Sequence, residues 1–365
     1  MNNSEHKERI IIGNQLKKAR ELLQLTPEEV AIEISTSPKD IVNWEQELTT
    51  PNLKYLEELS KLYGREVDYF LRETPNPPTE IEFRGKPGES LRNLSKDTKI
   101  VLARFDELCR NAVEFEELLD TKREVKISPY SSSEPLKKVS KDLREKYNLK
   151  DKPIINLREL LEHDGIRIFE LPIPNDEISG FSFWHSKYGP CILINANEIK
   201  GRKNFTLSHE LAHLLYGHKS SVCYIPSKIG EISHGIEYKA NQFAIELLLP
   251  EFPVVEDFKK RGFSKRPSEK ELRQISYKWG VSIQALGYRL ENLGLIEKGH
   301  IDTLLETKQF FKGKKGPRTP KWEKQLGKQF VETSIETCKK KFISIGKLAN
   351  VLGIPIRKAF EIVEQ

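Results

Sequence analysis

The sequence predicts a multidomain, mainly α-helical protein. It has an all-α N-terminal domain, an α+β central domain with a small sheet, and a helical C-terminal extension. Three observations predict this class. The 365 residues suit two or three domains of roughly 100–200 residues each. Apolar residues recur mostly at helical spacing, and only three short central runs have the pattern of strands. Linker-like segments, one rich in Pro and the other in Ser and Pro, occur at residues 74–78 and 128–135.

We therefore divide the chain into four parts. Residues 1–72 form a helical domain, 73–134 a linker with a long connector helix, 135–258 the α+β domain, and 259–365 a basic helical region. The last part carries 24 basic and 11 acidic side chains, whereas the first 258 residues carry 36 basic and 43 acidic. This asymmetry suggests an acidic partner such as nucleic acid for the basic part. A solvated surface, or contact with the acidic N-terminal part of the same chain, explains it equally well.

Several protein classes are excluded. No apolar run approaches the roughly 20 residues of a membrane-spanning helix, and the N-terminus lacks the apolar core of a signal peptide. The four cysteines (Cys109, Cys191, Cys223 and Cys338) are scattered and form no Cys-x-x-Cys pair. We expect a cytoplasmic protein with buried, reduced thiols and no membrane contact.

Residues 10–72 predict five short helices. Thr26 can cap the second helix, with Pro27 at its first position and Glu29 closing a capping box. A three-residue turn then leads to a third helix that begins at Pro38. Helix, short turn and helix together give the geometry that reads DNA.

This segment resembles the Xre (Cro/repressor) helix-turn-helix family, and the resemblance implies that Pro38, Lys39 and Asn43 face the major groove. The sequence departs from the family at Pro27, where Gln is usual, and at Ser35, where Gly is usual. With 8 basic and 11 acidic side chains, the segment neutralises few phosphates alone. A helical bundle for dimerisation or partner docking is therefore the alternative. The residues that carry the resemblance are Leu16, Arg20, Leu25, Thr26, Val30, Ala31, Ile41, Trp44, Glu45 and Pro51.

The strongest chemical signal is His209-Glu210-Leu211-Ala212-His213, which lies within an apolar pattern of helical period. Histidines four residues apart share one face of a helix and can both bind one zinc ion. Glu210 projects about 100° around that helix, where it can approach a water beside the metal. This is the His-Glu-x-x-His pattern of zinc metallopeptidases. The alternative is two surface histidines on an ordinary helix.

A catalytic zinc needs a third protein ligand and an open position for water. Glu237 is the best candidate, since Ala240 and Ala244 on the same predicted helix would let it approach the histidine helix closely. Asn241, one turn further, would support a ligand from behind. The alternative for Glu237 is a solvated helix residue. The other downstream candidates are His218, Cys223, Glu231, His234 and Glu246.

Residues 205–213, the later Glu237-x-x-Ala240-Asn241-x-Phe243-Ala244 and the upstream Ser179-Gly180-Phe181 resemble the ImmA/IrrE family of metallo-endopeptidases. The similarity extends over roughly residues 150–300. It implies a zincin-like fold in which His209, His213 and Glu237 bind Zn²⁺ and Glu210 is the catalytic base. It also implies that the substrate is a helix-turn-helix repressor or an antitoxin-like protein, since family members act in phage, mobile-element, stress or defence loci.

Three runs predict a small sheet: Ile166–Leu171, Ser179–Trp184 and Cys191–Asn195. One edge of it could pair with an extended substrate, or the sheet could simply support the helices. Candidate donors to the oxyanion of the reaction are His218, Tyr224, His234 and Tyr238, which the sequence does not rank.

The C-terminal region predicts helices at 268–279 and 283–292, and a second helix-turn-helix-like pattern around Leu352–Pro355. Its lysines could meet phosphates, be solvated or dock an acidic partner. They include Lys312, Lys314, Lys315 and Lys339–Lys341, together with Arg318.

The leading hypothesis is a zinc endopeptidase joined to a regulatory DNA-binding domain. The protein could act as a homodimer. The second is a DNA-binding regulator or antitoxin whose peptidase-like domain is a sensor or docking module with little turnover. The third is a toxin that cleaves a host protein. The intact Glu210 favours an enzyme, because a structural zinc site has no use for a base.

Overall fold

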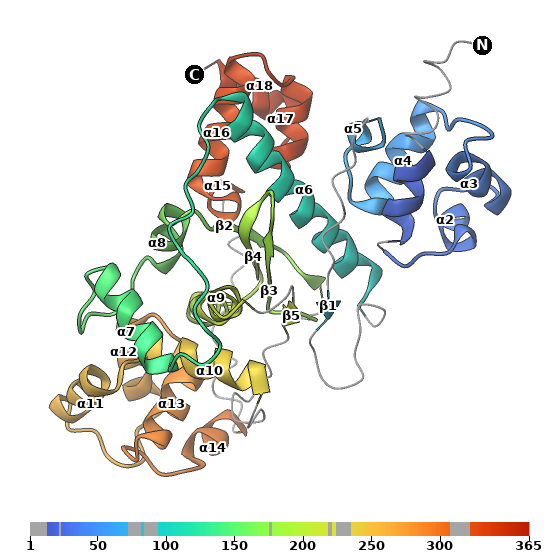
Figure 1. Ribbon diagram of the computed structural model, residues 1–365. Coiled ribbons are helices and arrows are strands. Elements are labelled where there is room, and N and C mark those ends of the chain that lie inside the picture. The colour runs from blue at the N-terminus through green and yellow to red at the C-terminus, as the bar shows by residue number, and fades with distance from the viewer. Residues whose placement is uncertain are drawn as a thin grey trace.

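The computed structural model describes residues 13–21, 23–71, 82–83, 94–174, 177–217, 221–223, 235–306 and 322–364 (Figure 1). Within them, buried apolar side chains form three clusters, one inside the N-terminal helices and two associated with a central sheet. No helix in these segments is long and apolar enough to span a membrane. The predicted class is confirmed: a helical domain, an α+β domain with a small sheet, and further C-terminal helices.

The N-terminal domain is the predicted bundle of five short helices. Thr26 and Ser37 begin the second and third helices with reciprocal capping bonds to Glu29 and Asp40. The turn between these helices passes through Ser35 at φ +54°, a conformation that glycine adopts most easily. The helices are residues 13–21, α2 (Pro27–Glu33), α3 (Pro38–Glu45), α4 (Leu53–Tyr63) and α5 (Val67–Phe70).

In the described residues, the sheet of the central domain has five strands in the order β1-β5-β3-β4-β2. The predicted hairpin is formed by β3 and β4, but neither of its strands is an edge, because β5 pairs with β3 and β2 pairs in parallel with β4. The two outermost strands are β1 and β2. The strands are β1 (Glu82–Phe83), β2 (Arg167–Leu171), β3 (Gly180–His185), β4 (Gly189–Asn195) and β5 (Ser221–Cys223).

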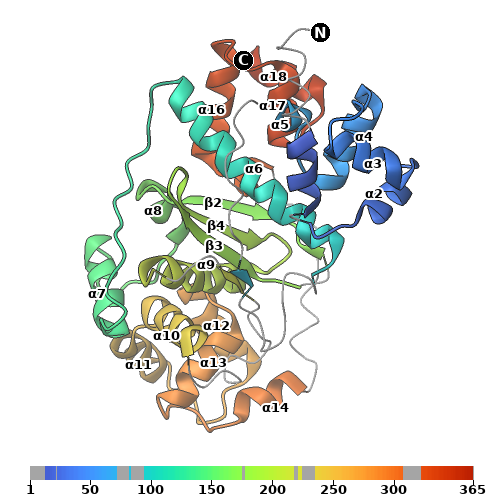
Figure 2. The same ribbon diagram turned by 45° about the vertical axis from the view of Figure 1, so that its right-hand side comes forward.

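Both faces of the sheet are buried along β4, and alternate residues of each strand face opposite sides. On β4, Ile192 and Ile194 belong to the cluster that holds α9 and α10, while Cys191 and Leu193 belong to the cluster of α6. Figures 1 and 2 show α9 and α10 on one side of the sheet and α6 crossing the other. The helices are α6 (Lys96–Leu118), α7 (Leu136–Lys146), α8 (Leu157–His163), α9 (Lys200–Leu215) and α10 (Gly235–Leu248).

The C-terminal helices divide between the two sides. The first group joins the cluster of α9 and α10, which continues to Ile301 without a break at residue 259. The second group packs with α6 on the opposite face. The first group is α11 (Glu251–Lys260), α12 (Glu269–Trp279), α13 (Ile283–Asn292) and α14 (His300–Glu306). The second is α15 (Trp322–Leu326), α16 (Lys328–Lys339), α17 (Ile345–Leu352) and α18 (Ile356–Val363).

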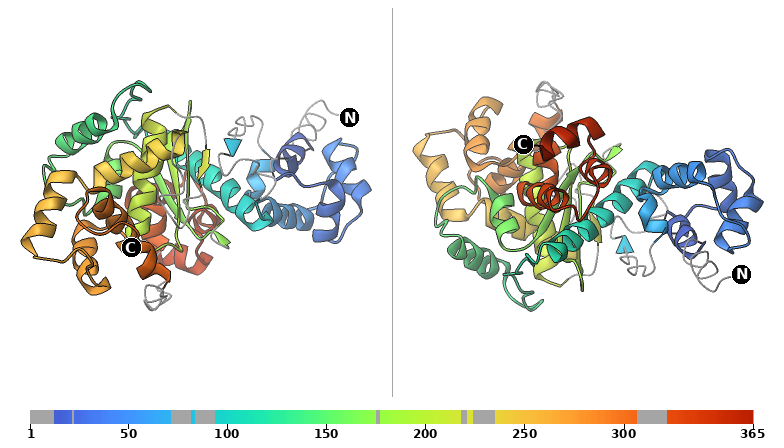
Figure 3. Two further views of the ribbon diagram at one scale, coloured as in Figure 1. Left: turned by 90° about the horizontal axis from the view of Figure 1, so that it is seen from below. Right: turned by 90° about the horizontal axis from the view of Figure 1, so that it is seen from above.

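The connector helix α6 belongs to two cores. Ala103 packs in the cluster of the N-terminal domain, whereas Phe105 and Leu108 pack in the cluster behind the sheet. Figure 3 shows the N-terminal helices projecting to one side of the molecule from this helix. Within the described residues, α6 therefore links the two domains through apolar packing on both sides.

Candidate metal centre

The two histidines of α9 converge on one point. His209 and His213 are each about 1% exposed, and their Nε2 atoms lie 3.1 Å apart. This follows from the spacing of four residues, which places both imidazoles on the same face of the helix. The predicted juxtaposition of the two rings is therefore present.

Glu237 reaches the same point from α10. Its Oε2 lies 3.1 Å from Nε2 of His209, and its Oε1 lies 3.5 Å from Nε2 of His213. Ala240 and Ala244 of α10 are both buried in the cluster that also holds α9, and their small side chains leave room for a close approach of the two helices. One ligand atom from each of the three residues lies within 4.8 Å of the other two.

The spacing and chemistry of these three groups suit a zinc ion. Ligand atoms about 2.0–2.1 Å from zinc at tetrahedral angles lie about 3.3 Å from one another. The two Nε2 atoms lie 3.1 Å apart, and the two carboxylate oxygens of Glu237 lie 3.1 Å from Nε2 of His209 (Oε2) and 3.5 Å from Nε2 of His213 (Oε1), which is close to this value. Two imidazoles and one carboxylate leave a fourth position open, as catalytic zinc sites do. The same donor set accepts other divalent metals.

Asn241 holds the ring of His209 from behind. Its Oδ1 lies 2.9 Å from Nδ1 of His209, and both side chains are buried. If Nδ1 carries the proton and donates it to this oxygen, Nε2 presents a lone pair toward His213 and Glu237. A metal-ligating imidazole usually has such a partner, which fixes its tautomer and orientation. The structure therefore brings Asn241 and His209 together, and the supporting role of Asn241 stays a prediction.

At the metal centre, His209 and Glu237 shift each other's pKa values against the effect of burial. Burial acts to raise the pKa of Glu237, but hydrogen bonds and charges from His209 and His213 outweigh it and hold that pKa well below its usual range. Burial acts to lower the pKa of His209, but the hydrogen bond to Glu237 and the charge of Glu210 outweigh it and raise the pKa. The half-buried carboxylate of Glu237 and the buried imidazoles beside it thus act as each other's counter-charge.

Glu210 is fully buried between α9 and β3. Ser182 on β3 donates a hydrogen bond of 2.6 Å from its Oγ to Oε2 of Glu210. A Cβ atom at Gly180 would lie only 2.8 Å from Oε1 of Glu210, so glycine is what leaves room for this carboxylate. The strand and the helix together therefore fix the orientation of the Glu210 side chain.

Ser182 is the residue that sequence reasoning missed. Gly180 and Ser182 alternate on β3 with Phe181 and Phe183, which pack on the other side of the sheet. A strand with small or polar residues on one face and aromatic residues on the other was a usable signal for a polar site. Among the candidate oxyanion donors, Tyr238 lies on α10 and is 37% exposed, while the other candidates fall outside the described residues.

The predicted DNA-reading residues lie on α3. Pro38 and Lys39 are exposed, and Asn43 is half-buried. Arg20 ties the first helix to the end of α3 by donating hydrogen bonds of 2.6 and 2.8 Å to the carboxylate of Glu45. Figures 1 and 3 show α3 on the outer side of its domain, away from the sheet.

Comparison with known proteins agrees with this arrangement. A helix-turn-helix family model matches residues 16–70, and a peptidase family model described as the IrrE N-terminal-like domain matches residues 161–291. The chain is also 33% identical over 109 residues to uncharacterized immunity region protein 2 of Bacillus phage phi105, a match that covers 30% of this chain and 67% of that protein. The peptidase match contains the whole centre and supports a metallopeptidase-type domain, and the other family match supports DNA binding.

Proposed function

This chain belongs to the IrrE-like peptidase family and joins its peptidase domain to a helix-turn-helix domain, and on that basis we propose that it is a zinc-dependent endopeptidase coupled to DNA reading. The observation that carries the proposal is the convergence of His209, His213 and Glu237 on one point, with ligand atoms within 4.8 Å of one another. Glu210 follows His209 directly on the same helix.

Zinc held by the three ligands would polarise the scissile carbonyl and acidify a water molecule. The residues of the chain supply the rest of the chemistry. Asn241 orients the imidazole of His209, and Ser182 orients the carboxylate of Glu210. Glu210 takes a proton from the attacking water and returns it to the leaving amine. The burial of Glu210 keeps bulk water away from this transfer.

The proposed substrate is a repressor or an antitoxin-like protein of a bacterial or phage regulatory, toxin–antitoxin or defence module. Two observations support this choice. The peptidase domain is joined to a helix-turn-helix domain, and the phage relative is named as an immunity region protein. We propose that α3 reads DNA through Pro38, Lys39 and Asn43. The buried free thiols of Cys109, Cys191 and Cys338 fit the reducing cytoplasm that such a role requires.

A second candidate function is a DNA-binding regulator whose peptidase domain turns over little. The observation in its favour is that Glu210 is fully buried and engaged by Ser182, so the base is not exposed to an incoming peptide. In this case the zinc centre acts as a sensor or a docking module. The presence of a base beside three ligands favours the enzyme.

The first test is the metal content of purified protein. We expect about one zinc per chain in the wild type, retention in Glu210→Gln, and strong loss in Glu237→Ala. Glu210→Gln should then serve as a trap for the substrate, because it keeps the centre but lacks the base. Cleavage of the trapped protein by Glu210→Gln would refute the mechanism. No metal in the wild type after zinc is supplied would favour the regulator.

A further inference from the structure

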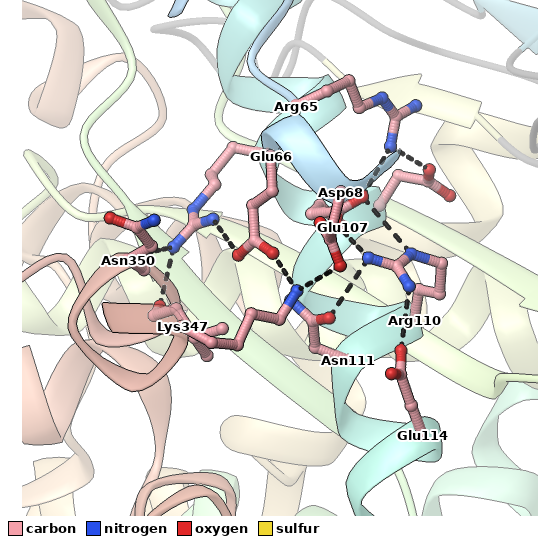
Figure 4. A network of polar contacts seen from close by, with 12 residues as sticks. Arg65, Glu66, Asp68, Glu107, Arg110, Asn111, Glu114, Lys347 and Asn350 are labelled. Carbon is pink, nitrogen blue, oxygen red and sulfur yellow. Dashed lines mark hydrogen bonds and ion pairs between the residues drawn. The ribbon is translucent and has the colours of Figure 1, made fainter. Parts of the chain in front are cut away.

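A second group of charges, most of them buried or half-buried, lies where the N-terminal domain, α6 and α17 meet (Figure 4). Helices α6 and α17 belong to the cluster on the other face of the sheet from the metal centre. We call it the three-way joint and define it by the charged side chains within residues 65–68, 104–110 and 347. Figure 2 shows α5 beside α17, although the two are separated by most of the chain. Buried charges persist only where partners compensate them, so the contacts of the joint say what it holds together.

The N-terminal domain is fixed to α6 by Arg65. Its Nη1 lies 2.6 Å from Oδ2 of Asp106 and 3.4 Å from Oε2 of Glu107. The side chain of Arg65 is 3% exposed, and that of Glu107 is fully buried. Arg110 contacts Glu107 from the other side and completes the compensation of its charge. A buried, directional contact of this kind fixes the angle between the domain and the helix.

The same corner of the N-terminal domain is fixed to α17 by Lys347. Its ammonium contacts the carboxylate of Glu66 and lies 3.2 Å from that of Asp68. Arg104 connects α6 directly to α17. It donates hydrogen bonds of 2.5 and 2.7 Å to the carbonyl oxygens of Asn350 and Val351, near the C-terminal end of α17. A cation at a helix C-terminus is favourable because the free carbonyl groups carry partial negative charge.

The three-way joint is a network of ion pairs rather than a second metal site. Carboxylate oxygens of Glu66, Asp68 and Glu107 lie within 4.8 Å of one another, which is close enough for a metal ion. However, Lys347 contacts two of these carboxylates, and Arg65 and Arg110 contact the third. The cations that balance the cluster are therefore side chains, and one of them comes from the C-terminal region.

We propose that α17 is a latch that holds the helix-turn-helix domain in one orientation on the peptidase domain. The apolar contact between the N-terminal cluster and the rest of the described chain runs through Ala103 and Ile100 of α6. Domains joined by a small interface are mobile by default, so the directional charges of the joint decide the orientation. A partner that competes with Lys347 for Glu66 and Asp68 would release α17 from the N-terminal domain and loosen the orientation of that domain, while α17 stays packed on α6.

The consequence of the latch rests on the proposed function, because orientation matters only if α3 reads DNA. In a dimer the separation of two half-sites is set by the fixed geometry of the two reading helices. Releasing α17 would therefore change which operators the protein can span, without any change at the metal centre. The latch itself can be tested without DNA or a substrate, so its failure is distinguishable from failure of the proposed function.

The test is Lys347→Glu in the full-length protein, read by hydrogen exchange and small-angle X-ray scattering. The variant places a third acid against Glu66 and Asp68. We expect amide exchange in residues 65–70 to rise on the order of 100-fold and the radius of gyration to increase. Exchange in α9 should not change, which would show that the peptidase domain is intact. The matched control is Lys340→Glu, because Lys340 is exposed and pairs only with Glu336 among the described residues.

A second variant separates release of the latch from unfolding of α17. Glu66→Gln removes a charge from the N-terminal side of the same contact and leaves α17 unaltered. It should increase exchange in residues 65–70 in the same direction, while exchange in α17 stays low. Unchanged exchange and scattering in both Lys347→Glu and Glu66→Gln would overturn the proposal.

Discussion

The metal centre and the three-way joint are both clusters of potential metal ligands that lie within 4.8 Å of one another, yet they have opposite chemistry. At the metal centre, Glu237 faces two imidazoles whose Nε2 atoms both point inward. At the joint, Glu66, Asp68 and Glu107 face ammonium and guanidinium groups. The comparison shows that proximity of ligands does not define a metal site. What matters is whether the chain already supplies the cation.

The difference also sets the role of each cluster. Neutral imidazoles can bind a cation that comes from solution, so the first cluster can perform chemistry. At the joint, side chains of opposite charge from three regions of the sequence bind one another, so the second cluster fixes geometry. The predictions below test this division, from the largest expected effect to the smallest.

Removal of metal should affect one cluster only. A chelator should lower the apparent stability of the wild type by about 4 kcal/mol, or the melting temperature by roughly 10 °C, because zinc binds only the folded centre. Differential scanning calorimetry with and without chelator measures this shift. Glu237→Ala should show no shift, whereas Asp68→Asn should respond as the wild type does. A chelator shift that disappears in Asp68→Asn would place a metal at the joint instead.

Breaking the three-way joint should lower the free energy of unfolding and leave the zinc content unchanged. Arg65→Met leaves Asp106 and Glu107 buried without this cation, and we expect a loss of about 3–5 kcal/mol in the first unfolding transition in urea. Zinc content should stay at the wild-type value. The matched control is Arg357→Met, since the side chain of Arg357 is 92% exposed. A wild-type urea transition for Arg65→Met would mean that the joint contributes little to stability.

The two clusters also differ in how far the sequence predicts them. The metal centre was predictable because its residues lie in two local patterns of helical period, and two alanines mark where the helices meet. The joint was not, since Lys347 and Glu66 are 281 positions apart, and each looks like an ordinary surface charge on an amphipathic helix. The same limit applies to the short strands β1 and β5, whose pairing depends on chain segments distant in sequence. Ser182 is an intermediate case. The sequence shows the alternating pattern of its strand, but it does not show that Ser182 forms a hydrogen bond with Glu210.

Loss of the support behind a ligand should have an intermediate effect. Asn241→Ala removes the acceptor of the Nδ1 proton of His209 without removing a ligand. We expect zinc affinity to fall 10–100-fold, which is less than the loss for Glu237→Ala. Competition with a zinc-binding dye measures this change. Affinity equal to that of the wild type would show that packing alone orients His209.

The smallest effect should come from a charge that neither cluster contains. Lys39 is exposed at the start of α3, so replacing it should leave stability unchanged. If it contacts one DNA phosphate, Lys39→Ala should weaken binding to duplex DNA of random sequence and reduce the salt dependence of the binding constant by about one unit of slope. Fluorescence anisotropy at several salt concentrations measures that slope. The control is Lys54→Ala on α4, a lysine of the same domain that is also exposed but does not lie on α3. If the binding constants of Lys39→Ala and the wild type depend on salt with the same slope, Lys39 does not contact a DNA phosphate. Its exposed charge on α3 would then be an ordinary solvated side chain.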